Sequence, residues 1–202
     1  LYLFEFNKIL KKKKNFGNLT FISETFQRCY LGDKTTQVYF DNLINNDSGT
    51  DYSRYIFFYM GYLIEENKHE KAKEIVEDLE YLNTPILISQ GKKWIEEEKL
   101  EEFKRIFSCK NPNDLISEFF FLIGNLYSSK NNYEQSNFYL NISFFLNPKF
   151  TFNLSLLAEN YFLNENFIKT KIILKNFNKK DNFYYWFKIK KEAQIIAQEK
   201  NN

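Results

Sequence analysis

The stretch FLIGNLYSSKNNYEQSNFYLNISFFLNP, residues 121–148, decides the fold of this chain. It places a single glycine, Gly124, inside an apolar run and closes with Pro148. A glycine in the middle of a helix costs about 0.5–1 kcal/mol relative to alanine, so a compensating contact is expected. We therefore expect Gly124 to allow a second helix to approach closely.

The same stretch, with the residues before it, predicts two helices joined by a short loop. From Ser117 to Tyr127 the apolar residues recur at the spacing of one buried helix face. The polar run SSKNN, residues 128–132, ends this helix, and a second amphipathic segment covers residues 133–146. Pro148 cannot continue that helix. Residues 117–150 are thus predicted to form one antiparallel helix pair.

This helix pair repeats along the chain. Gly124 is followed by Tyr127, Ser136 and Leu140, and three other segments carry the same offsets. These segments are Met60, Leu63, Ala72 and Val76; Gly91, Trp94, Phe103 and Phe107; and Ala158, Tyr161, Thr170 and Leu174. Weaker matches are Tyr30, Tyr39 and Leu43 upstream, and Ala193 and Ile196 downstream. From Leu63 onward the aromatic or apolar position recurs at intervals of 31, 33 and 34 residues, a period typical of a solenoid of helix pairs.

On these residues the chain resembles tetratricopeptide repeat proteins, whose unit of about 34 residues is one helix pair. The best match, residues 117–150, rests on Phe120, Ile123, Gly124, Tyr127, Ser136, Leu140, Ser143 and Pro148. Residues 151–184 match through Leu154, Leu157, Ala158, Tyr161, Thr170 and Leu174, with Asn182 in place of the proline. The resemblance, closest in kind to divergent bacterial members, implies an all-α, right-handed α-solenoid of antiparallel helix pairs.

The resemblance implies a single helical-repeat domain over residues 1–202. Its parts are degenerate N-terminal helices (1–52), repeat units (53–84, 85–116, 117–150 and 151–184), and a truncated C-terminal repeat or capping helix (185–202). Unit 53–84 carries Gly61 one position late, and unit 85–116 places Phe103 where the family has a small residue. The charged stretch WIEEEKLEEFKRIF (94–107) predicts shortened helices. The apolar LYLFEF (1–6) suggests a preceding helix or a docking partner, and the polar IIAQEKNN (195–202) a capped end.

Composition points to an ordinary soluble protein. The chain has 202 residues, 44% hydrophobic and 27% charged, with a net charge of +2. This balance argues against nucleic acid as a partner, which usually requires a clustered basic surface. No segment has the 18 or so consecutive apolar residues of a membrane span, so we expect a soluble protein of the cytoplasm or periplasm. The run KKKK (11–14) is interpreted as a solvated connector, although it could contact phosphate or anionic lipid.

The sequence predicts no catalytic residue, metal or cofactor. His69 lies in EENKHEKAKE, interpreted as a polar inter-helix loop without a catalytic pocket, and EEEKLEE (96–102) is interpreted as a solvated helix face. The two cysteines and one histidine are too few for a zinc site. Cys29 and Cys109 are predicted to be buried free thiols, although the sequence leaves a disulfide open. Trp94 and Trp186 are predicted to be core residues.

The resemblance also implies a binding groove lined by residues of the first helices. Its candidate residues are Phe121, Asn125, Ser128, Phe152, Ser155, Glu159 and Phe162. Packing between repeats is an equally good interpretation of the aromatic ones. Only Asn125 fits the family's clamp for a terminal carboxylate, because Phe121 stands where the clamp carries lysine. We therefore expect apolar anchors with hydrogen bonds from Asn125.

These expectations favour a non-catalytic scaffold or assembly factor that binds a peptide or partner protein. One alternative is a helical-repeat RNA-binding protein, since similar arrays of helix pairs read one base per repeat. A second alternative is a non-catalytic helical module of a larger envelope enzyme.

Overall fold

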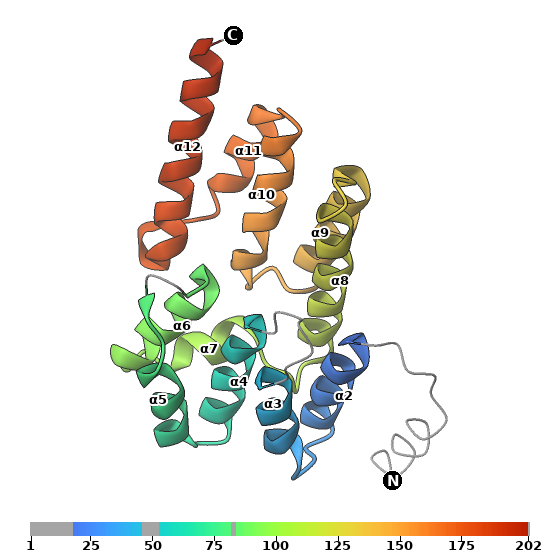
Figure 1. Cartoon of the computed structure of the whole chain (residues 1–202), viewed down its shortest axis with the longest axis vertical. Coiled ribbons are helices and arrows are strands. Elements are labelled where there is room, and N and C mark those ends of the chain that lie inside the picture. The colour runs from blue at the N-terminus through green and yellow to red at the C-terminus, as the bar shows by residue number, and fades with distance from the viewer. Residues whose placement is uncertain (1–17, 46–52, 82–83, 202) are drawn as a thin grey trace. The chain divides into compact units, whose positions relative to one another are not determined.

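The computed structural model describes residues 18–45, 53–81 and 84–201, and these ranges contain helices and loops but no strand (Figure 1). The all-α prediction is confirmed for this part of the chain. The chain divides into two compact units, residues 1–112 and 113–202. No helix in the described ranges is both long and apolar enough to cross a bilayer.

The helices come in consecutive pairs. Unit 1 contains α2 (Asn18–Tyr30), α3 (Thr36–Ile44), α4 (Arg54–Glu65), α5 (His69–Glu77), α6 (Ile86–Glu96) and α7 (Glu101–Ile106). Unit 2 contains α8 (Pro112–Ser128), α9 (Tyr133–Leu146), α10 (Leu154–Leu163), α11 (Phe167–Leu174) and α12 (Phe183–Asn201), with short 3₁₀ turns at Thr151–Asn153 and Lys179–Asp181. α9 has the predicted bounds, and the shortening predicted around residues 94–107 is confirmed by the six residues of α7.

Four of the pairs are joined by the same tight loop. Each loop has one residue with positive φ, and these recur at intervals of 31, 33 and 34 residues: Asn67, Glu98, Asn131 and Glu165. The N–H of the next residue donates to a carbonyl five positions back, at 2.7, 2.7, 3.0 and 2.8 Å respectively. Those carbonyls belong to Leu63, Trp94, Tyr127 and Tyr161. This bond is the helix-ending Schellman motif, and it falls on the predicted register in all four pairs.

The N-terminal pair follows the same rule in a different register. Gly32 has the positive φ, 65°, and the N–H of Asp33 donates to the carbonyl of Arg28 at 3.0 Å. The position equivalent to Leu63 is therefore Arg28, and the predicted match at Tyr30 is wrong. Tyr30 is instead 46% exposed at the end of α2, because the glycine sets the loop and the aromatic residue does not.

The close approach expected at Gly124 is confirmed. A Cβ atom added to Gly124 would lie 2.8 Å from Cγ of Leu140 and 3.2 Å from the carbonyl oxygen of Ser136. The Ser136 hydroxyl also donates to the carbonyl of Gly124 at 2.7 Å. The contact between α8 and α9 thus combines a leucine packed over the glycine with a buried hydrogen bond, which together offset the helix penalty of glycine.

Gly91 explains why unit 85–116 tolerates Phe103. A Cβ atom at Gly91 would lie 3.2 Å from Cζ of Phe103 and 2.8 Å from Cε of Met60. Phe103 also packs edge-on against Trp94, with ring centroids 5.3 Å apart. The large residue on the second helix is therefore accommodated by a small one on the first. Trp94 is buried in this cluster, as predicted.

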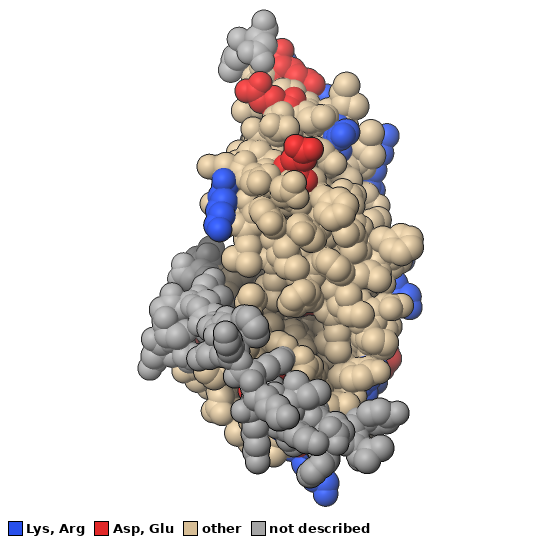
Figure 2. Space-filling view, turned by 90° about the vertical axis from the view of Figure 1, so that its right-hand side faces the viewer, with Lys and Arg blue, Asp and Glu red and all other residues tan. Residues whose placement is uncertain are grey.

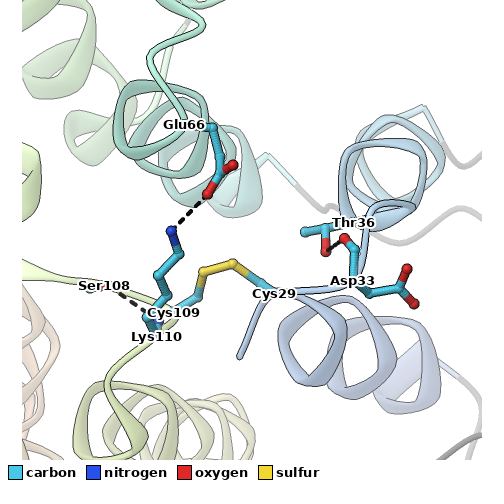
Figure 3. The surroundings of a disulfide bond; sticks show 7 residues. All are labelled: Cys29, Asp33, Thr36, Glu66, Ser108, Cys109 and Lys110. Carbon is cyan, nitrogen blue, oxygen red and sulfur yellow. Dashed lines mark hydrogen bonds and ion pairs between the residues drawn. A yellow bond between two sulfur atoms is a disulfide. The ribbon is translucent and has the colours of Figure 1, made fainter. Parts of the chain in front are cut away.

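A disulfide joins Cys29, at the end of α2, to Cys109 in the loop after α7 (Figure 3). Their Cα atoms are 5.8 Å apart, and both side chains are buried. The predicted burial is confirmed, and the preference for free thiols is wrong, because folding brings together positions 80 residues apart in the chain. Beside the disulfide, Lys110 forms an ion pair with Glu66 at 2.7 Å.

Arg28, one position before Cys29, anchors the turn that follows α2. Its guanidinium contacts Glu24 at 3.0 Å and Asp33 at 2.5 Å. Although burial alone would raise the pKa of Asp33, hydrogen bonds from Thr35 and Arg28 lower it below its usual value. The end of α2 is therefore stabilised by the ion pairs of Arg28, by the positive-φ turn at Gly32 and by the disulfide.

Replacing Gly124 by alanine should lower the free energy of unfolding of unit 2 by about 1–3 kcal/mol, because the added methyl overpacks the contact with Leu140 and Ser136. Gly61 is the matched control, since its added Cβ would lie 3.6 Å from Phe103, an ordinary contact. Gly61→Ala should be neutral or stabilising by about 0.5–1 kcal/mol. Urea unfolding followed by circular dichroism measures both, and equal effects would contradict the packing argument.

Replacing both cysteines by alanine should lower the free energy of unfolding of unit 1 by about 2–4 kcal/mol, because a long cross-link restricts the unfolded chain. Urea unfolding with and without reductant tests this. Reductant should lower the midpoint of the wild-type protein and leave the double variant unchanged. Alkylation of two cysteines in the unfolded, unreduced protein, detected by mass, would refute the disulfide.

Candidate partner-binding surface

The first helices of unit 2 lie beside one another and are held by polar contacts. Ser128 of α8 donates a hydrogen bond to the side-chain oxygen of Asn160 of α10 at 2.6 Å. On its other side, Glu159 of α10 pairs with Lys191 of α12 at 2.7 Å. α8, α10 and α12 therefore form a row of three neighbouring helices.

Asn160 is the centre of a buried hydrogen-bond network. Its side chain is 0% exposed, and its amide nitrogen donates to Oγ of Ser136 at 2.7 Å and to Oδ1 of Asn137 at 3.0 Å. The Ser136 hydroxyl in turn donates a hydrogen bond to the carbonyl of Gly124. A satisfied buried network of this kind fixes one arrangement of the helices that it joins. In a chain so rich in asparagine, nothing in the local sequence distinguished Asn160.

Lys191 is a buried cation between α10 and α12. Besides its ion pair with Glu159, its ammonium lies 4.1 Å from the ring centroid of Phe162. The side chain of Lys191 is only 7% exposed, against 34% for Glu159. The ammonium thus gains both an anionic and an aromatic partner for its burial.

The aromatic residues expected to line the groove are buried. Phe121, Phe152 and Phe162 are each less than one-tenth exposed. Phe152 stacks on Tyr184 of α12 with ring centroids 4.2 Å apart. These contacts match the interpretation of the aromatic residues as packing between repeats.

Of the four polar candidates, three already make contacts within the chain. Ser128 bonds to Asn160, Glu159 pairs with Lys191, and the hydroxyl of Ser155 donates to the carbonyl of Phe152 at 2.8 Å. Asn125 is exposed on α8. The structure therefore leaves Asn125 and the partly exposed Glu159 as the accessible polar candidates.

Equivalent positions on the three first helices carry polar side chains that are at least partly exposed. Asn125, Glu159 and Gln194 each directly follow the small residue of their helix, and Asn125 and Gln194 are exposed. Leu163, 51% exposed, is an apolar side chain at the end of α10. We call Asn125, Glu159, Leu163 and Gln194 the first-helix row. Sequence reasoning missed Leu163 and Gln194, although the repeat register would have placed Gln194.

Large apolar side chains are exposed on other faces. On α8 and α9 they are Ile116, Phe119, Leu126, Phe138 and Phe145, the last 83% exposed. Figure 2 shows a side of the molecule on which much of the described surface carries neither acidic nor basic side chains. Trp186 on α12 is 72% exposed, so its prediction as a core residue is wrong.

His69 is the first residue of α5 and not part of a loop. It lines an open depression with Glu70, Lys73, Ile95, Glu98 and Leu100. The acidic run 96–102 is solvated but covers the end of α6, the loop and the start of α7. Within the described ranges no three side chains of His, Cys, Asp or Glu gather as metal ligands would. The run KKKK (11–14) lies outside these ranges.

Comparison with known proteins found no matching family model, no matching curated protein and no matching solved structure.

Replacing Lys191 by methionine should lower the free energy of unfolding by about 1–3 kcal/mol, because the ion pair with Glu159 and the contact with Phe162 are lost. The neighbouring Lys190 is exposed, so Lys190→Met is a matched control and should stay within about 0.5 kcal/mol of wild type. Urea unfolding measures both variants. Equal stability of the two would mean that Lys191 does not hold α12 to α10.

Proposed function

We propose that this chain is a tetratricopeptide-like α-solenoid that acts as a non-catalytic scaffold, binding a peptide or partner protein. The observation that supports it most is the repeated loop. In four helix pairs a residue with positive φ follows the first helix at the same place in the loop, and these residues recur at intervals of 31, 33 and 34 positions. This local repeat is what a stack of equivalent helix pairs requires.

The proposed binding surface is the first-helix row. Its equivalent positions carry an amide, a carboxylate and a second amide: Asn125, Glu159 and Gln194. Neighbouring helix axes lie about 9 Å apart, and an extended peptide advances about 3.3 Å per residue. About six residues of an extended peptide would therefore cover the row, with amide hydrogen bonds to its backbone. Leu163 supplies an apolar contact at the edge, because the aromatic residues expected in that role are buried.

Rigidity of the first helices supports this use of the surface. The buried network around Asn160 and the Glu159–Lys191 pair fix α8, α10 and α12 against one another. A preorganised surface binds a flexible peptide with a smaller entropic cost than a surface that must order first.

The proposal is tested by capturing partners from a lysate of the organism that encodes the chain. Asn125→Arg combined with Gln194→Arg should abolish capture of a discrete polypeptide, because two bulky cations would occupy the row. Gln135→Arg combined with Asn141→Arg, at exposed positions of α9, is the matched control and should retain the partner.

Nuclease treatment separates the alternatives in the same experiment. A polypeptide that survives nuclease and is lost only in the row variant supports the scaffold. Capture that depends on nucleic acid and falls steeply with salt would replace the scaffold by an RNA-binding function. Equal capture by both variants would show that the row is not the binding surface.

A further inference from the structure

One face of α12 is exposed although its counterparts in the other helix pairs are covered. Ala193 and Ile196 occupy the positions of Gly124 and Tyr127 in α8, and of Ala158 and Tyr161 in α10. In α8, Gly124 is buried beneath Leu140 of α9. In α10, Ala158 is 0% exposed, and α11 packs against that helix.

On α12 this face forms a continuous apolar stripe. Trp186, Ile189, Ala193 and Ile196 are spaced three, four and three residues apart, as on one side of a helix. All four are exposed, Trp186 to 72% and Ile196 to 52%. We call them the α12 stripe. No described helix covers it as α9 covers α8.

The charges beside the α12 stripe identify the kind of helix that fits it. Lys190 is exposed on one edge, and Glu192 lies on the other edge with Glu199, which pairs with Lys171 of α11 at 2.7 Å. The edge of Lys190 therefore attracts an acidic side chain. The opposite edge carries Glu192 and Glu199, and Glu199 is already paired with Lys171.

The same charges disfavour a second copy of this chain as the occupant. Two antiparallel copies of α12 would bring like edges together, setting Lys190 beside Lys190 and Glu192 beside Glu192. Two parallel copies of α12 would set Lys190 of one copy beside Tyr185 of the other, so Lys190 would gain no partner of opposite charge. Like charges at such positions oppose pairing.

We propose that the α12 stripe binds an amphipathic helix of a partner protein, in the position that the second helix occupies in the other pairs. The pairs in this chain describe that helix: a small residue is followed four positions later by leucine or valine, as in Ser136–Leu140, Thr170–Leu174 and Ala72–Val76. The branched side chain lies over Ala193 as Leu140 lies over Gly124, and an acidic residue lies beside Lys190. This surface is distinct from the first-helix row and does not depend on the function proposed for it.

A segment of the chain itself supplies the probe. A fluorescein-labelled peptide of residues 66–81 contains Ala72, Val76 and Leu79 on one face and has more acidic than basic residues. With Val76 over Ala193 in an antiparallel pair, Glu80 falls beside Lys190. Fluorescence anisotropy measures its binding to the full chain.

The peptide should bind the wild-type chain, and Ala193→Arg should weaken binding by at least about tenfold, because the new charge enters the apolar contact. Gln198→Arg adds the same charge at another exposed position of α12 and should change affinity less than about twofold. Lys190→Glu should weaken binding, and a peptide carrying Glu80→Lys should restore it.

Three results would overturn the proposal: no binding by the wild-type chain, equal binding by the Ala193→Arg and Gln198→Arg variants, or a charge exchange without rescue. Sedimentation of the wild-type chain tests whether a second copy of this chain occupies the α12 stripe. A dimer that Ala193→Arg dissociates would assign the stripe to a second copy and refute the partner helix. The variant that combines Asn125→Arg with Gln194→Arg should leave peptide binding intact. A failure of the proposal for the α12 stripe is therefore distinguishable from a failure of the proposal for the first-helix row.

Discussion

The contact inside each helix pair is the constraint on which the remaining structure depends. Where Leu140 packs over Gly124, the two helices approach so closely that a single methyl group would overlap the leucine side chain and crowd the carbonyl of Ser136. Gly91 and Phe103 solve the same problem with the large residue moved to the other position of the second helix. At both contacts a glycine on the first helix leaves room for a large side chain on the second, as a close-packed interior requires.

The local parts of this architecture could be predicted from the sequence. Helix pairing, the bounds of α9 and the register through Leu63, Trp94, Tyr127 and Tyr161 depend on spacing within about ten residues, where periodicity and breaker residues act. The error at Tyr30 shows the limit of matching residue types alone. A positive-φ glycine at position 32 ends α2, and a glycine indicates a helix end more strongly than an aromatic residue does.

Long-range contacts could not be predicted, because no local pattern encodes them. Cys29 and Cys109 are 80 positions apart in the chain, and only the tertiary structure brings them together. Lys191 looks like any other lysine of a basic run until the fold sets it against Glu159 and Phe162. Burial of Phe152 similarly depends on Tyr184, which belongs to a different helix pair. Assigning surface or core to an aromatic residue in such a chain requires knowing its neighbour, and the neighbour is set by tertiary structure.

The repeat also gives a standard against which each surface can be judged. An exposed isoleucine or tryptophan is unremarkable by itself, since much of any protein surface is apolar. Ile196 is different because its equivalents Leu63 and Trp94 are buried, and its equivalents Tyr127 and Tyr161 are partly covered. Position within the repeat thus separates an apolar side chain that is merely exposed from one whose usual cover is absent from the described chain. Composition alone cannot make that distinction. Hydrophobicity by itself does not decide whether Phe145 or Ile196 is the better candidate for a binding contact.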